Sequence, residues 1–322
     1  MTQQVSTRRD FIKQTALGLC AIHVAGRVWA ASNTGDIPTR PLGSTGVNVS
    51  MIGLGGHHIG RIRDDNQSVR LIRKAIDSGV TFLDNAWEYH NGRSEELVGK
   101  ALTGGYREKA FLMTKHHGRD KKTAMKHLED SLRRLRTDVI DLWQFHEVVY
   151  EDDPEMIYAV GGGIEAADLA KKQGKARFIG FSSHDRRWIQ FMIEYFPQVD
   201  VVCFPFTTMS KRAPQDSLFD ALKKRDVGAF GIKPFAAASL FAASPQENNQ
   251  RGRLAIRYIL HSNTVIPIPG MNSIREVDNV IAAVKERRQL DLKESATLEH
   301  AGRQAWAKLP AQYQWLKDWQ YV

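Results

Sequence analysis

Residues 80–96 read V-T-F-L-D-N-A-W-E-Y-H-N-G-R-S-E-E, and this stretch organises the interpretation of the whole chain. A short apolar run ends on Asp84, and Tyr89 follows in a polar segment. Asn91-Gly92 marks a turn, and Ser94-Glu95-Glu96 then begins a helix with acidic residues in its first turn. A carboxylate at the end of a strand and a phenol in the following loop therefore project into one space.

Two further apolar runs also end on polar residues. Lys115 closes the run F-L-M-T-K, and His146 closes the run V-I-D-L-W-Q-F-H. Polar groups at the ends of consecutive strands converge when those strands are parallel neighbours. The sequence thus predicts an active site at the carboxyl ends of the strands of a barrel.

The pattern of the whole chain agrees with an α/β fold, a (β/α)8 TIM barrel. Apolar runs alternate with helical segments such as 120–136, in which apolar residues recur every three or four positions. The runs lie near residues 51–55, 80–84, 110–114, 139–145, 176–181, 199–204, 227–232 and 264–268. A doubly wound sheet is the alternative, but G-L-G-G-H-H-I-G only partly imitates the glycine spacing of a dinucleotide-binding turn.

Smaller features are expected on either side of this barrel. A hairpin is predicted around Ser44-Thr45-Gly46, because turn residues separate two short extended segments. We expect the barrel domain to cover residues 38–288. A helical tail rich in Trp and Tyr should cover residues 289–322, either packed under the barrel or folded over its mouth.

Composition excludes several classes of protein. A chain of 322 residues with 42% hydrophobic content can bury one large core, which suits one barrel of roughly 250 residues plus extensions. The net charge is +9, but no run of interleaved basic and aromatic residues indicates nucleic-acid binding. Cys20 and Cys203 are too few for an iron–sulfur cluster. No apolar stretch after residue 31 approaches the roughly 20 residues that span a bilayer, so a soluble body is expected.

The N-terminus has the features of an export leader. Residues 7–13 read T-R-R-D-F-I-K, and a short, weakly hydrophobic segment and small residues follow. This pattern resembles a twin-arginine (Tat) signal peptide over residues 1–31, with cleavage after Ala30 or Ala31. The resemblance implies a periplasmic protein, with the Tat translocase as its partner during export.

Several motifs together resemble the aldo-keto reductase family over roughly residues 38–285. They are F-L-D-N-A-W-E-Y-H-N-G-R-S-E-E, then K-A-R-F-I-G-F-S-S-H, then V-I-P-I-P-G-M-N-S, in the order in which the family carries them. The resemblance implies an oxidoreductase that transfers hydride between a nicotinamide cofactor and an aldehyde or ketone, or the corresponding alcohol. A reductase-like barrel that binds nicotinamide as a sensor or partner-binding protein, with little turnover, is the alternative.

The resemblance implies that Asp84, Tyr89, Lys115 and His146 form the catalytic tetrad. Hydride addition to a carbonyl leaves an alkoxide, which a tyrosine hydroxyl can protonate. The Lys115 ammonium would lower the pKa of the phenol, and Asp84 would keep Lys115 charged and oriented. His146 would polarise the carbonyl oxygen. Taken singly, Asp84 and Lys115 could be a structural salt bridge and His146 a core histidine.

The resemblance also implies NADP as cofactor, with NAD possible. The implied cofactor-binding residues are Ser182, Ser183, Cys203, Ile232, Lys233, Gly270, Met271, Asn272 and Ser273. Two of these depart from the family pattern, because Cys203 replaces a glutamine and Ile232 replaces an aromatic residue. Gly270 and Glu276 stand where basic residues would grip a 2′-phosphate, although Arg275 is adjacent. Gly270 to Ser273 precede a helix, whose N-terminus suits a phosphate.

The substrate is expected to be a small carbonyl compound or alcohol. His57, Trp87 and Phe206 are the residues predicted to line the pocket. The pairs His57-His58 and His116-His117 are rich in histidine, but no carboxylate with zinc-like spacing joins them. We therefore expect no metal site.

Overall fold

The computed structural model describes residues 37–151 and 153–322. The predicted signal peptide, residues 1–31, lies outside the described residues. In the described part of the chain, no helix combines the length and the apolar character needed to cross a membrane.

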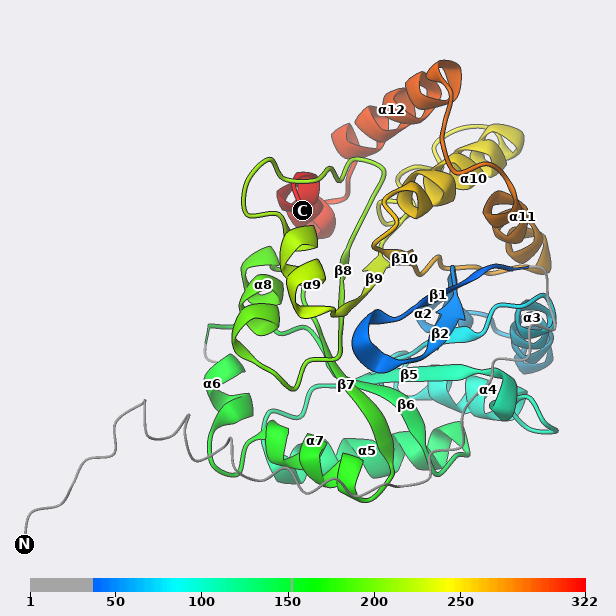
Figure 1. The fold of residues 1–322 in the computed structure, drawn as a ribbon. Helices are drawn as coiled ribbons and strands as arrows, with labels where there is room; N and C mark the ends of the chain where they lie inside the picture. The colour runs from blue at the N-terminus through cyan, green and yellow to red at the C-terminus, as the bar shows by residue number, and fades with distance from the viewer. Residues whose placement is uncertain (1–36, 152) are drawn as a thin grey trace, which may run out of the picture. The chain divides into compact units, whose positions relative to one another are not determined.

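An eight-stranded parallel sheet forms the barrel (Figure 1). Its strands follow one another in chain order, so each strand pairs with the next. They are β3 (Gly53–Gly55), β4 (Phe82–Asp84), β5 (Phe111–His116), β6 (Ile140–Phe145), β7 (Ala176–Ser182), β8 (Val201–Pro205), β9 (Gly228–Ile232) and β10 (Ile266–Pro267). The backbone N–H of Gly55 donates to the carbonyl of Pro269 at 3.0 Å, which joins the first strand to the chain just after the last. The predicted (β/α)8 barrel is confirmed, with each strand inside or within two residues of its predicted run.

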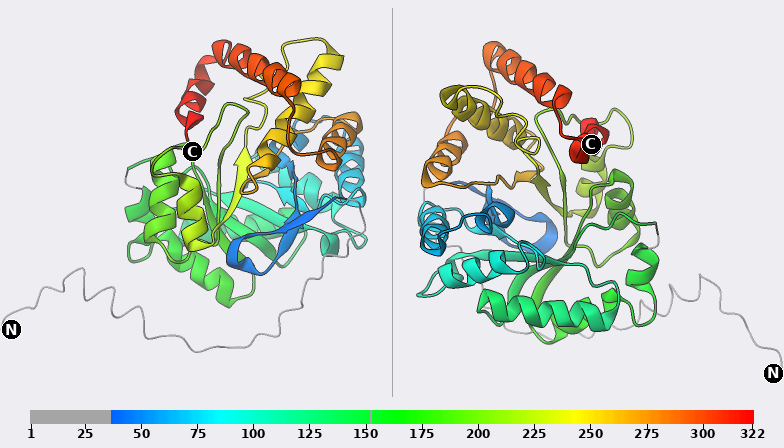
Figure 2. Two further views of the ribbon diagram at one scale, coloured as in Figure 1. Left: turned by 45° about the horizontal axis from the view of Figure 1, so that its top comes forward. Right: turned by 180° about the vertical axis from the view of Figure 1, so that it is seen from behind.

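Helices flank the strands (Figure 2). The main ones are α3 (Asp65–Asp77), α4 (Arg93–Ala101), α5 (Lys121–Leu135), α7 (Gly163–Lys172), α8 (Arg186–Tyr195), α9 (Leu218–Arg225), α10 (Pro245–His261) and α11 (Ile274–Lys285). The shorter α2 (Gly56–Ile59) and α6 (Asp153–Tyr158) follow β3 and β6. In α5, Asp120 caps the N-terminus by accepting from Thr123 N–H, and Leu128, Leu132 and Leu135 bury one face.

The predicted hairpin lies before the barrel. Strands β1 (Thr39–Pro41) and β2 (Asn48–Ser50) pair antiparallel across a 3₁₀ turn. Gly43 adopts a left-handed φ of 52°, and a Cβ there would collide with the backbone of Gly228. The Ser44 N–H donates to the Asp226 carbonyl at 2.7 Å. The hairpin is therefore attached at the start of β9, at the end of the barrel opposite to the strand ends that carry the predicted tetrad.

Aromatic side chains fill the barrel interior. The Phe82 ring stacks on Phe230, with 3.8 Å between ring centroids, and lies 6.1 Å from Phe111. Gly53 permits this packing, because a Cβ at that position would collide with the Phe82 ring. Phe82 and Phe111 begin their strands, so the polar residues at the carboxyl ends lie on the other side of this apolar layer.

The C-terminal tail is helical, as predicted, and returns to the carboxyl ends of the strands. It consists of α12 (Leu292–Ala307) and a 3₁₀ segment, Ala311–Gln320. Trp319 is fully buried, stacks on Phe204 of β8 and donates from its indole nitrogen to the His184 carbonyl at 2.8 Å. The red C-terminal segment thus lies beside β8 and α8 (Figure 1). Of the two predicted placements, the structure favours the one near the mouth.

Candidate active site

Asp84 and Lys115 meet at the ends of β4 and β5. Both side chains are almost fully buried, and their charged groups form a salt bridge. The Lys115 ammonium also donates to the Asn85 carbonyl at 2.8 Å. Because parallel strands align their carboxyl ends, residues far apart in the sequence reach one point, as the sequence predicts.

Tyr89 lies beside this pair. Its hydroxyl oxygen is 3.4 Å from Lys115 Nζ, which donates to it. The loop that carries Tyr89 turns sharply, because His90, Asn91 and Gly92 all adopt left-handed φ angles of 53°, 56° and 90°. Asn and Gly tolerate this conformation best, which confirms the predicted turn and allows α4 to begin at Arg93.

The pKa values of Tyr89 and Lys115 are both raised, but by different causes. Burial raises the pKa of Tyr89 above its ordinary value, although the charge of Lys115 opposes this shift. Burial alone would lower the pKa of Lys115, but the charges of Asp84 and Tyr89 raise it above its ordinary value. In this structure the tyrosine is therefore protonated and the lysine charged near neutral pH. The charge of Lys115 lowers the pKa of the Tyr89 phenol, as expected. Burial raises that pKa by more, so the net shift is upward.

His146, directly after β6, completes the group. Its ring centroid lies 5.7 Å from that of Tyr89. Burial lowers the pKa of His146 to about 3, and the carboxylate of Glu88 only partly offsets this effect. The imidazole is thus neutral. The structure brings all four predicted tetrad residues together, which is what their assigned roles require.

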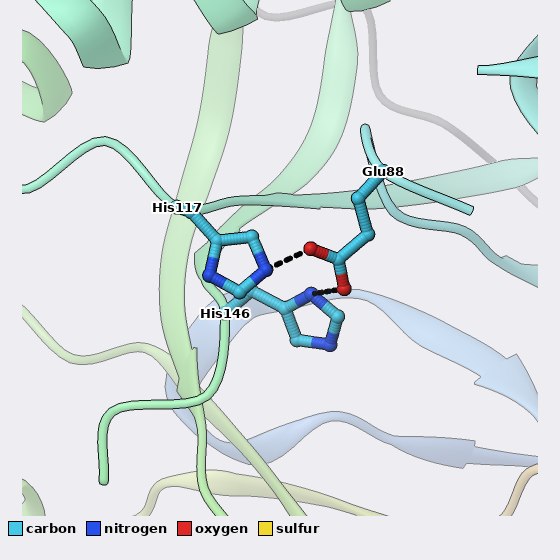
Figure 3. A group of neighbouring side chains, drawn as sticks. All are labelled: Glu88, His117 and His146. Carbon is cyan, nitrogen blue, oxygen red and sulfur yellow. Dashed lines mark ion pairs between the residues drawn. The ribbon is translucent and has the colours of Figure 1, made fainter. Parts of the chain in front are cut away.

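Glu88 is a residue that the sequence reasoning missed. Its carboxylate faces two imidazoles, those of His117 and His146 (Figure 3). Burial would raise the pKa of Glu88, but the two rings hold it well below its usual range. The sequence contained a signal for this contact. Glu88 directly precedes Tyr89, and His117 and His146 directly follow the strands β5 and β6.

The histidine pairs of the sequence separate in space. The His57 ring lies 5.2 Å from the Tyr89 ring, so His57 adjoins the tetrad as predicted for a pocket residue. The His58 ring covers Gly270, where a Cβ would collide with it. His116 instead stacks on Trp143 at 4.0 Å and is fully buried. It is therefore a core residue.

The other two predicted pocket residues point elsewhere. The Trp87 indole nitrogen donates to Asp130 at 3.3 Å, and its ring stacks on His127 of α5 at 3.8 Å. Trp87 therefore packs against the flanking helix, because that helix offers both an acceptor and an aromatic face. Phe206 is buried against Phe219 of α9. The predictions for Trp87 and Phe206 as pocket residues are not supported.

The predicted nicotinamide contacts surround the same strand ends. Ser182 Oγ accepts from Glu147 N–H at 3.1 Å, and Ser183 Oγ donates to the Val148 carbonyl at 2.6 Å. Both serines thus hold the loop after β6, and a role toward a cofactor stays a prediction. Cys203 is fully buried, which raises the pKa of its thiol to about 12 and keeps it neutral.

Ile232 ends β9, and Lys233 follows it with a left-handed φ of 59°. The Lys233 ammonium lies 5.5 Å from the ring centroid of Tyr313 in the tail. Burial lowers the pKa of Lys233. This lysine therefore connects the strand end to the tail beside the tetrad.

The predicted phosphate site is the N-terminus of α11. Gly270, Met271 and Asn272 lead into it, and Ser273 caps it by accepting from Glu276 N–H. The exposed Arg275 has no ion pair among residues 37–151 and 153–322, so its guanidinium is available to an anion. Glu276 works against this, since its carboxylate already accepts from Asn272 N–H at 2.7 Å. The N-terminus of α11 has the backbone N–H donors that suit a phosphate, and the Asn272 N–H among them is engaged by Glu276.

A cavity of about 670 Å³ lies away from these residues, along α10, α11 and α12. Its wall includes Arg257, which binds Glu294 at 2.8 Å and Glu286 at 3.3 Å. Arg253 and Arg287 pair with the same two carboxylates, so every charged side chain of the wall takes part in an ion pair. None of the tetrad residues lines the cavity.

Comparison with known proteins identifies the family. The model of the aldo/keto reductase family matches residues 51–253. L-galactose dehydrogenase of Arabidopsis thaliana is 24% identical over 299 residues, covering 82% of this chain and 93% of that protein. Aldo-keto reductase YhdN of Bacillus subtilis is 35% identical over 159 residues, covering 44% of this chain and 46% of the relative.

Solved structures show the same architecture. The holo form of an aldo-keto reductase from Bacillus halodurans has a TM-score of 0.68 and 25% identity, covering 86% of this chain and 99% of that one. An aldo-keto reductase from Klebsiella pneumoniae in complex with NADPH has a TM-score of 0.68 and 27% identity, covering 82% of this chain and 94% of that one. With the tetrad assembled at the strand ends and the family model spanning most of the barrel, the chain belongs to the aldo/keto reductase family.

Proposed function

We propose that this protein is an NADP-dependent oxidoreductase that interconverts a small aldehyde or ketone and its alcohol, with Tyr89 as the proton donor. The observation that carries the proposal is the position of the Tyr89 hydroxyl, 3.4 Å from a fully buried Lys115 that is itself paired with Asp84. The NADPH bound to the relative from Klebsiella pneumoniae supports the choice of cofactor.

The cofactor, when bound, supplies or accepts the hydride. Tyr89 gives its hydroxyl proton to the oxygen of the reacting carbonyl as that oxygen gains charge. The Lys115 ammonium stabilises the phenolate that is left, and Asp84 keeps the ammonium in position. The neutral His146 ring orients the carbonyl oxygen by a hydrogen bond. In alcohol oxidation the same groups act in reverse.

Residues around the strand ends would hold the cofactor. Arg275 and the N-terminus of α11 provide positive potential for phosphate. The partly exposed Ile232 offers apolar surface at the end of β9, whereas Cys203 is fully buried in β8 and presents no surface to a ligand. Lys233, which follows Ile232 and lies beside Tyr313 of the tail, adds a cation at the same strand end. The Glu276 carboxylate competes with phosphate for one backbone N–H, which keeps NAD open as a second cofactor.

Replacing Tyr89 with Phe tests the proposal. Carbonyl reduction should fall by the roughly 10²–10⁴-fold that a general acid contributes, while NADPH binding, measured by fluorescence titration, should persist. The exposed Tyr195 is the matched control, since Tyr195→Phe should leave both unchanged. Retention of most activity by Tyr89→Phe would show that another group donates the proton. A wild-type protein that binds nicotinamide but reduces no carbonyl would favour the sensor alternative.

We also propose that the protein is exported as a folded barrel by the twin-arginine route and works in the periplasm. The support is the leader sequence, with Arg8 and Arg9 followed by Phe11 and Lys13. Replacing both arginines with lysine should keep the protein in the cytoplasm, as judged by fractionation and immunoblotting. Unchanged export of that variant, or export in cells without the translocase, would refute this route.

Export would separate the protein from the cytoplasmic pool of cofactor. We therefore expect the cofactor to be held tightly and regenerated in place, with one alcohol oxidised as another carbonyl is reduced. The tail supports this idea, because it lies at the same strand ends as the tetrad. Native mass spectrometry of periplasmic protein should show one nicotinamide per chain. An empty protein that is active only with added cofactor would contradict the mechanism.

A further inference from the structure

Glu88 and His117 converge on His146, a member of the tetrad, from separate segments of the barrel (Figure 3). Glu88 comes from the loop after β4, His117 follows β5, and His146 follows β6. One ligand atom from each, a carboxylate oxygen and two ring nitrogens, lies within 4.8 Å of the other two. The spacing argument against a metal compared only the paired histidines, so it missed this group.

The buried member of the group, His146, has a ring nitrogen whose contact is the Glu88 carboxylate of the same group. His146 is 6% exposed, and its Nδ1 forms no aligned hydrogen bond, although Glu88 Oε1 is 3.0 Å away. A buried polar atom without a partner costs free energy, commonly about 1–3 kcal/mol. The nitrogen is directed toward the Glu88 carboxylate and the His117 ring (Figure 3). This is the side on which a ligand would satisfy it.

The charge of the group is also incomplete. Glu88 is a carboxylate between two imidazoles, and within residues 37–151 and 153–322 no lysine or arginine forms a salt bridge with it. The charged Lys115 nearby is engaged by Asp84. A cation between the three ligand atoms would neutralise Glu88 and bind Nδ1 of His146.

The geometry and donor types suit a transition metal. A tetrahedral Zn²⁺ with bonds of about 2.0–2.2 Å places its ligand atoms roughly 3.3 Å apart. Glu88 and His146 are 3.0 Å apart, and His117, which contacts Glu88 directly, would rotate outward to admit the ion. Two imidazoles favour Zn²⁺ and its first-row neighbours over Mg²⁺ or Ca²⁺, which prefer oxygen ligands. Glu88 and His117 are each about one-third exposed. An ion could therefore enter from solvent and keep a fourth position for water or substrate.

We propose that Glu88, His117 and His146 form a binding site for one divalent transition-metal ion, with Zn²⁺ as the reference ion, next to the catalytic tyrosine. A metal on Nδ1 requires the proton of the neutral His146 ring to reside on Nε2. That tautomer can donate a hydrogen bond to a carbonyl oxygen. If Nδ1 instead carries its proton toward Glu88, Nε2 is left as an acceptor. The ion would thus fix the His146 tautomer that the proposed function requires. The metal site itself is tested by zinc binding, independently of that function.

Zinc binding tests the site independently of turnover. Full-length protein, treated with EDTA and freed of it, is titrated with Zn²⁺ in competition with a chromophoric chelator. Wild type should bind one ion per chain. Glu88→Gln and His117→Ala should each weaken binding by more than the roughly 10–100-fold that loss of an outer hydrogen-bond partner to a metal ligand costs. Circular dichroism and thermal melting verify that both variants are folded.

Glu147→Gln is the matched control. Glu147 lies 3.3 Å from His184, so this pair resembles Glu88 and His146, but within the described residues it belongs to no group of three ligand atoms. Zinc affinity should not change in this variant. As a measurement that needs no variant, one equivalent of Co²⁺ added to wild type should give visible d–d absorption that excess Zn²⁺ abolishes. Absence of stoichiometric binding, or equal binding by wild type, Glu88→Gln and His117→Ala, would overturn the proposal. Loss of activity in Tyr89→Phe has no bearing on this result.

Discussion

Replacing Lys115 with Met should destabilise the barrel strongly, because it leaves the Asp84 carboxylate buried without its cation. The side chain of Lys115 is 1% exposed and that of Asp84 is 5% exposed. The Lys115 ammonium also donates a hydrogen bond to the Asn85 carbonyl at 2.8 Å. Removing one partner of a buried ion pair costs about 3–5 kcal/mol. Met fills much of the space of the lysine stem, so the loss reflects charge and hydrogen bonding rather than a cavity. We expect the free energy of unfolding to fall by that amount.

A double-mutant cycle isolates the pair. Asp84→Asn alone leaves a buried ammonium without its carboxylate, and the combined Asp84→Asn/Lys115→Met variant removes both charges. The loss in the double variant should be smaller than the sum of the single losses by several kcal/mol, since each single change strands an uncompensated charge. Urea unfolding followed by tryptophan fluorescence measures all four proteins, with the slope m compared to verify that they unfold in the same way. Additive losses, within about 0.5 kcal/mol, would refute the view that the two charges stabilise each other.

Other regions give independent predictions. Arg134→Met should lower the free energy of unfolding by about 3–5 kcal/mol, because it strands the fully buried Glu95, whose carboxylate lies 3.2 Å from the guanidinium; urea unfolding measures it. Trp319→Ala should cost about 3–5 kcal/mol and expose the tail to proteolysis, because this fully buried ring attaches the tail to the strand ends. Burial lowers the pKa of His184 from 6.5 to about 3, so the unfolded chain binds its proton more readily. Stability should fall as pH decreases from about 6.5 toward 3, by up to about 1.4 kcal/mol per pH unit, and His184→Gln should flatten that profile in urea unfolding at each pH.

Much of the fold followed from local pattern. Strands of a parallel barrel are buried on both faces, so they appear in the sequence as continuous apolar runs, and the runs near 110–114 and 139–145 became β5 and β6. The helix predicted over 120–136 became α5, because its apolar spacing buries one face. The last strand, β10, is shorter than its predicted run, 264–268, because Pro267 and Pro269 lack the N–H groups that extend a ladder.

The tetrad also followed from the sequence, for a topological reason. In parallel strands that pair in chain order, the last residues of successive apolar runs must lie at one edge. Asp84, Lys115 and His146 occupy such positions, and Tyr89 follows in the adjoining loop. Neither packing detail nor side-chain direction was needed to bring them together.

Only the tertiary structure decided where individual side chains point. Trp87 lies in the decisive stretch, yet its ring packs on α5, since Asp130 and His127 there offer a better partner than the pocket. Glu88, the next residue, faces two histidines that follow different strands. The tail reached the barrel mouth because Trp319 finds the His184 carbonyl, 135 residues earlier in the chain. A sequence pattern reports which residues are apolar and where elements end. The direction of a loop side chain depends instead on contacts with distant residues, and these exist only once the barrel has closed.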